Sequence, residues 1–95
     1  MDFEWDFAKA ARNLVKHGVS FETAARVFAD PFAMTRQDRI EAGQQRWQTL
    51  GMADGLVLLL VAHTVREDDS AEVIRLISAR RADPTERKRY EQETR

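Results

Sequence analysis

ADGLVLLLVAHTVR, residues 53–66, joins a turn signal to the longest apolar run of this 95-residue chain. Asp54 and Gly55 favour a β-hairpin, because both residue types accept the positive φ of a tight hairpin turn. The run that follows, residues 56–62, is typical of a central strand covered on both faces. It is far shorter than the roughly 20 residues that cross a bilayer, so we expect no membrane helix.

Two short helices are expected before this hairpin. In residues 6–18, Asp6 is the N-cap, apolar residues recur at helical spacing, and Gly18 ends the helix. Residues 20–31 repeat the pattern, with Ser20 as N-cap and Pro31 as the stop.

Period-two patterns predict the strands. A weak strand at 32–38 is followed by strands at 45–53, 56–66 and 73–80. Asp83 then caps a final helix, with Glu86 three residues later. The fold class expected is α+β: two N-terminal helices, an antiparallel sheet of three to four strands and a C-terminal helix. Residues 1–95 form one domain, because a second core has no room.

The composition excludes several classes of site. Because the chain has no cysteine, it can form neither a disulfide nor a thiolate metal centre. The two histidines lie far apart in the sequence, so no metal is expected. No phosphate-binding loop is present, and no cofactor is expected. The acidic N-terminus lacks the basic start and apolar run of a signal peptide, so we expect no signal peptide and a cytoplasmic location.

Charge is unevenly distributed along a chain whose net charge is −1. The near-neutral total and the lack of a helix-turn-helix pattern count against a DNA-binding regulator acting alone. Residues 75–89 nevertheless hold six bases against two acids. We expect them to form a local anion-binding surface. The six are Arg75, Arg80, Arg81, Arg87, Lys88 and Arg89.

The hairpin register decides which side chains share a face. A two-residue turn at Asp54-Gly55 would place Arg46 opposite His63, with both on one face of the sheet. The loop of the last hairpin is ambiguous in length. Either Ser78 and Arg80 or Ala79 and Arg81 share that face, since a slip of one residue exchanges them.

A metal-free ribonuclease needs a proton acceptor, a proton donor and cations for the extra charge on phosphorus. Arginine suits the last task. Histidine and tyrosine suit the first two, but each has an ordinary structural explanation. His63 is equally well explained as a partly buried histidine, and His17 is better explained as stabilising a helix C-terminus. The charges of the last helix are also typical of a solvated face.

The segments FEWDFAKAARNLVKHGVSFETAARVFADP, RW and LG within RWQTLG, HTVRE, and VIRLISARRADPTERKRYE together resemble the BrnT family of type II toxin–antitoxin toxins. The resemblance covers roughly residues 3–91. Its specific parts are KHGVSF and ISAR, the latter followed by ER and Y. Where many relatives have tyrosine before the threonine of the central strand, this chain has His63. Positions matching the family's characteristic residues are Lys16, His17, Gly18, Arg46, Arg66, Ile77, Ser78, Ala79, Arg80, Glu86, Arg87 and Tyr90.

The resemblance implies a compact RelE-like fold and a ribonuclease that stalls translation. It also implies a partner, a BrnA-like ribbon-helix-helix antitoxin, through which alone the pair contacts DNA. A degenerate toxin that only binds an antitoxin or nucleic acid is the alternative. On the ribonuclease hypothesis the expected catalytic residues are Arg46, His63, Arg80 and Tyr90. Those expected to bind RNA are Arg66, Arg81, Arg87 and Lys88.

Overall fold

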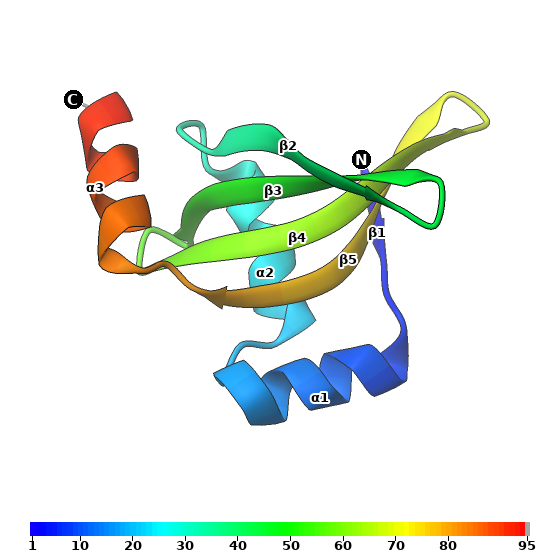
Figure 1. The fold of residues 1–95 in the computed structure, drawn as a ribbon, viewed down its shortest axis with the longest axis horizontal. Coiled ribbons are helices and arrows are strands. Elements are labelled where there is room, and N and C mark those ends of the chain that lie inside the picture. Colours follow the sequence, from blue (N-terminus) through cyan, green and yellow to red (C-terminus); the bar gives the residue numbers. More distant parts are fainter. Residues whose placement is uncertain (95) are drawn as a thin grey trace.

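The computed structural model describes residues 1–94, which form a five-stranded mixed sheet with helices on both sides (Figure 1). The strand order is β1-β5-β4-β3-β2, so the apolar β4 lies at the centre, as predicted. The α+β class and its three helices are confirmed. The elements are β1 (Asp2–Glu4), α1 (Phe7–His17), α2 (Phe21–Ala25), the 3-10 helix η1 (Arg26–Ala29), β2 (Met34–Glu41), β3 (Gln44–Ala53), β4 (Val57–Asp68), β5 (Ala71–Arg81) and α3 (Pro84–Glu93).

The sheet differs from the expected one by a short strand. β1 pairs with β5 in parallel, whereas all other neighbouring pairs are antiparallel. Three residues are too few to show an alternating pattern, so this strand could not be predicted from the sequence.

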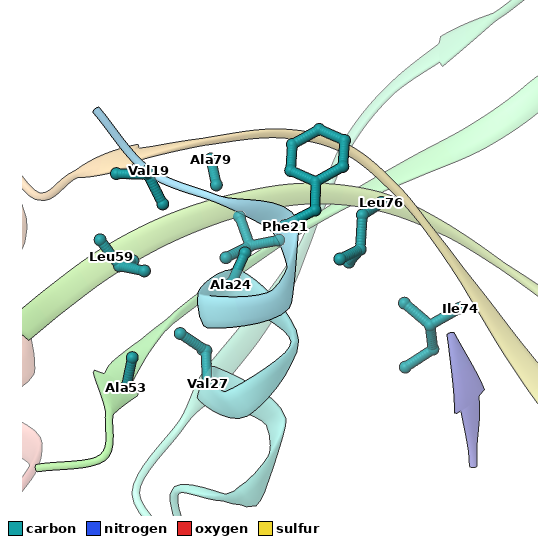
Figure 2. Close-up of a cluster of buried hydrophobic side chains, with 10 residues drawn as sticks. Val19, Phe21, Ala24, Val27, Ala53, Leu59, Ile74, Leu76 and Ala79 are labelled. Atoms are coloured by element: carbon teal, nitrogen blue, oxygen red, sulfur yellow. The ribbon is translucent and has the colours of Figure 1, made fainter. Parts of the chain in front are cut away.

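The main core lies between α2, η1 and the sheet face that we call the α2 face (Figure 2). Phe21, Ala24 and Val27 project from the helices and are fully buried. They pack on apolar side chains of β3, β4 and β5, where alternate residues point to one face. Because this packing buries one side of each strand, only side chains on the opposite side can form a functional site. The strand residues are Ala53, Leu59, Val61, Ile74, Leu76 and Ala79.

A smaller core lies on the opposite face, which we call the α3 face. Tyr90 of α3 packs there against Leu50, Leu58 and Leu60. α3 begins with the predicted capping box, in which Asp83 and Glu86 each accept a backbone N–H of the other. Figure 1 shows α3 at the end of the sheet that carries the β3–β4 turn. The remainder of the α3 face is left uncovered by this helix.

The register predicted for the β3–β4 hairpin is wrong by one residue. Ala53 pairs with Val57, so the loop has three residues and not two. Asp54 and Gly55 do adopt positive φ, as expected. Because side chains alternate, the extra residue, Leu56, moves His63 to the face opposite Arg46.

Asn13 of α1 closes part of the β5 edge. Its side-chain amide donates to the Ala79 carbonyl at 2.9 Å, and its oxygen accepts the Ala79 N–H at 3.1 Å. The same amide donates to the Val19 carbonyl at 2.9 Å. One side chain thus satisfies the backbone groups that a further strand would otherwise pair.

The outer surface of α1 is apolar but exposed. Phe7 and Val15 are 85% and 89% accessible, and Leu14 is half exposed. α1 contacts the sheet along β5, below it in Figure 1, through the side that carries Asn13. Within residues 1–94 no helix is long and apolar enough to cross a membrane.

Candidate functional site

A groove of about 490 Å³ runs along the uncovered part of the α3 face, between β2 and the C-terminal end of α1. Polar and charged side chains from four elements converge there. We refer to it below as the groove. It is lined by Lys16, His17, Asp38, Arg39, Arg46, Gln48, Leu60, Ala62, Ile77, Ser78 and Arg80.

The last hairpin sends Ser78 and Arg80 into the groove. Ala62 pairs with Ser78 and Leu60 with Arg80, whereas Ala79 is buried in the main core. The register shifts at Ile77, which is left without a partner on β4. This bulge resolves the ambiguity in the sequence, because it lets Leu76 and Ser78 point to opposite faces.

Arg80 is held by Glu86 of α3. The Arg80 Nη1–Glu86 Oε1 distance is 2.8 Å and the Nη2–Oε2 distance is 2.9 Å. Glu86 is buried, which alone would raise its pKa, but the Arg80 guanidinium and the Asp83 N–H together lower it. Glu86 therefore stays ionised and orients the arginine that lines the groove.

Arg46 extends from β3 into the groove and pairs with a carboxylate of β2. Its Nε lies 3.0 Å from Glu41 Oε2, and its side chain is only 23% exposed. Gln48, two residues along, donates to Asp38 Oδ2 at 3.3 Å. The groove thus presents two anchored guanidinium groups and an exposed carboxylate, Asp38, on one surface.

α1 contributes Lys16 and His17 to the same groove. Gly18 ends the helix in a left-handed conformation, and its N–H bonds to the Leu14 carbonyl. The two basic residues occupy the last turn, where cations complement the helix dipole, as predicted for His17. His17 is half-buried. Of the two histidines, both within residues 1–94, His17 lines the groove and His63 does not.

His63, expected in the site, lies instead in the main core. It is 1% exposed, and its Nε2 lies 2.8 Å from Thr49 Oγ1, which also bonds to Thr35 Oγ1 at 2.7 Å. The Phe28 ring meets the imidazole edge-on, with centroids 4.9 Å apart. Burial lowers the pKa of His63 to about 4, so the ring is neutral near pH 7.

Tyr90 lies on the α3 face but does not line the groove. Its hydroxyl donates to Asp30 Oδ2 at 2.6 Å. Burial and the Asp30 carboxylate raise the pKa of Tyr90 to about 12. The structure therefore holds this hydroxyl as a protonated donor to Asp30, outside the set of side chains that line the groove.

The four residues expected to bind RNA also lie outside the groove. Arg66 forms ion pairs with Glu4 and Asp68 at the far end of β4. Arg81 is on the α2 side, beside Val19 and Leu59. Arg87 and Lys88 are exposed on α3. The structure thus brings together two of the eight expected residues, Arg46 and Arg80.

Sequence reasoning missed the parts of the groove that depend on irregular backbone. Asp38 and Arg39 reach it where β2 shifts register, in a segment expected to end its strand at residue 38. Lys16 and His17 matched the family pattern, which was the available signal for them. Among residues 1–94, no three His, Asp or Glu side chains come close enough together to hold a metal ion.

Comparisons with known proteins agree with this architecture. Residues 5–86 match the family described as the ribonuclease toxin, BrnT, of type II toxin–antitoxin systems. The 1.1 Å crystal structure of the Brucella abortus ribonuclease toxin BrnT superposes with a TM-score of 0.60. It is 24% identical, and the match covers 87% of this chain and 97% of that one, which shows a shared fold. No curated protein matches the sequence. Because the family match spans most of its length, the chain belongs to the BrnT family of ribonuclease toxins of type II toxin–antitoxin systems.

Proposed function

We propose that this chain is a metal-independent endoribonuclease whose active site is the groove, and that it arrests translation in the cytoplasm by cutting RNA. One observation carries the proposal: Arg46, Arg80 and His17 converge from β3, β5 and α1 on one open groove. Family membership supplies the class of activity, and this convergence supplies the chemical groups that the activity needs.

The reaction uses the nucleophile that RNA already carries. The 2′-oxygen bonds to the adjacent phosphorus, the bond from phosphorus to the 5′-oxygen breaks, and the products are a 2′,3′-cyclic phosphate and a 5′-hydroxyl. Arg46 and Arg80 stabilise the additional negative charge on the phosphorus oxygens, for which their planar forks are suited. Both forks are already oriented by carboxylates, so little ordering is required when RNA binds.

Two protons move in this reaction. We assign the Asp38 carboxylate to accept the proton of the 2′-hydroxyl, and protonated His17 to donate one to the leaving 5′-oxygen. Both side chains line the groove. His63 and Tyr90 take no part in this assignment, because one is buried in the core and the other is bound to Asp30.

A cognate antitoxin completes the proposal. We propose a BrnA-like ribbon-helix-helix partner that inhibits by covering the groove and carries the DNA contacts of the pair. The support is the family, whose toxins belong to type II toxin–antitoxin systems. Exclusion of RNA from the groove then suffices for neutralisation.

The test is cleavage of a defined RNA by purified protein in the presence of EDTA, with analysis of the product ends. We expect cyclic phosphate and 5′-hydroxyl ends, and loss of cleavage in Arg46→Ala, Arg80→Ala and His17→Ala. Lys88→Ala, an exposed cation outside the groove, is the matched control and should retain activity. In cells, Arg80→Ala should abolish growth arrest at equal protein abundance. A folded wild type that leaves RNA intact, with or without ribosomes, would instead favour the non-catalytic interaction module.

A further inference from the structure

The groove continues into a second hollow beside α1. This hollow, of about 270 Å³, is lined by Lys9, Arg12, Lys16 and Asn13, together with residues that also line the groove. Lys16, His17, Ile77 and Ser78 belong to both. The two hollows are therefore neighbours that share these four side chains, and together they extend from β3 past the β5 bulge to the side of α1.

Lys9, Arg12 and Lys16 form a cationic row on α1. Their spacing of three and four residues places them on one side of the helix. The row spans about 10 Å along the axis at 1.5 Å per residue, close to the length of three stacked nucleotides at about 3.4 Å each.

This row differs from the arginines of the groove in having no internal partner. Arg39, Arg46 and Arg80 are each paired with a carboxylate. Lys9, Arg12 and Lys16 are exposed and make no ion pair with any residue in 1–94. Among the described residues, no Asp or Glu lines their hollow. In a chain of net charge −1, three exposed cations without an ion-pair partner, beside the proposed active site, mark a place for an external anion.

We infer that the α1 row is a binding track for the phosphate backbone of single-stranded RNA, which leads the strand into the groove. This inference rests on the proposed function and extends it from the cleavage point to the length of RNA that the protein holds. The contacts are to phosphate, so the track adds affinity without selecting a base.

Binding of an RNA analogue that cannot be cleaved tests the track separately from catalysis. The probes are 2′-deoxy oligonucleotides of about three and about twelve nucleotides, bracketing the footprint of a small single-strand site. The wild-type protein should bind the longer probe more tightly than the shorter one. Lys9→Gln/Arg12→Gln should lose most of that gain and leave the short probe unaffected, because neither residue lines the groove.

Salt dependence supplies a second readout. Two lost phosphate contacts should reduce the slope of log affinity against log salt by about 1.4, at about 0.7 per contact on single strands. Arg87→Gln/Lys88→Gln, an equal charge change on α3, should leave the slope and the length effect intact. The charge-conserving Lys9→Arg/Arg12→Lys should bind as wild type does.

The outcomes separate this inference from the proposed function. If the α1 double variant binds the longer probe as wild type does, or if the α3 control weakens binding equally, the track is refuted, whether or not the wild type cleaves RNA. If wild type shows α1-dependent binding yet cleaves no natural RNA, the track stands and the ribonuclease proposal fails.

Discussion

Arg80 and Glu86 face each other across the junction between β5 and α3 as a two-pronged ion pair. Glu86 is the buried member, with its side chain 11% exposed, and Arg80 is 41% exposed toward the groove. Glu86 also accepts the Asp83 N–H that closes the capping box. One carboxylate thus ties the start of α3 to the orientation of a groove arginine.

Glu86→Gln separates these two roles, because glutamine also serves in a capping box. We expect the free energy of unfolding to change by less than about 1 kcal/mol, since Arg80 is partly exposed and the cap is kept. We expect kcat for RNA cleavage to fall about tenfold, because the guanidinium is no longer fixed. Urea denaturation and single-turnover cleavage measure the two. Unchanged cleavage would show that Arg80 acts without this orientation.

The neutral, buried His63 predicts sensitivity to acid. Its pKa is about 4 in the folded chain, against an ordinary 6.5 when unfolded. Between these values the unfolded state binds more protons, so stability is complete above pH 6.5 and falls as the pH is lowered toward 4. The loss amounts to about 3 kcal/mol at 1.36 kcal/mol per pKa unit.

Denaturation midpoints measured from pH 8 to pH 4 test this expectation. His63→Phe should flatten the profile above pH 4.5 relative to wild type, with Thr49 retaining its bond to Thr35. Asn13→Ala, a buried substitution that removes no titratable group, is the control and should keep the wild-type slope. Identical slopes in wild type and His63→Phe would contradict the prediction.

Tyr90→Phe distinguishes a structural hydroxyl from a catalytic one. Its bond to Asp30 is charge-assisted, so its loss should cost about 1.5–3 kcal/mol of stability. Because Tyr90 lies outside the groove, cleavage by the folded variant should match that of wild type. A large fall in kcat with unchanged stability would instead show that the Tyr90 hydroxyl takes part in catalysis.

Asn13→Asp tests how strongly one side chain secures the β5 edge. The substitution is close to isosteric but removes the amide donor to the Ala79 and Val19 carbonyls. We expect a loss of about 2–4 kcal/mol, because buried carbonyls lose partners and a carboxylate is placed beside them. Urea denaturation measures the loss, and Asn13→Ala should show a comparable one. A loss below 1 kcal/mol in both variants would mean that water replaces the amide.

The elements of this fold could be predicted because their signals are local. Asp6, Ser20 and Asp83 cap helices as expected, and each accepts a hydrogen bond from the first turn. The apolar run of residues 56–62 marks the central strand. By contrast, the β1–β5 pairing joins residues 2–4 to residues 73–75, far apart in the sequence, and no local pattern encodes it.

The candidate site could be predicted only in part, because it depends on register. Arg46 and Arg80 were expected together and do line one groove. His63 was not brought there, because the hairpin loop contains Leu56 and one residue reverses every side chain beyond it. A turn signal identifies a hairpin but does not count its loop residues.

The register shift in β2, at the exposed edge of the sheet, has two consequences. β2 is open to solvent along nearly its whole length, and its register shifts between Gln37 and Ile40 so that Asp38 and Arg39 together oppose Arg46. A bulge with charged residues prevents another chain from adding a strand there, and so guards a free toxin against self-aggregation. The same two residues line the groove. Straightening β2 would therefore withdraw two side chains from the groove and, at the same time, leave a regular strand edge with which another chain could pair.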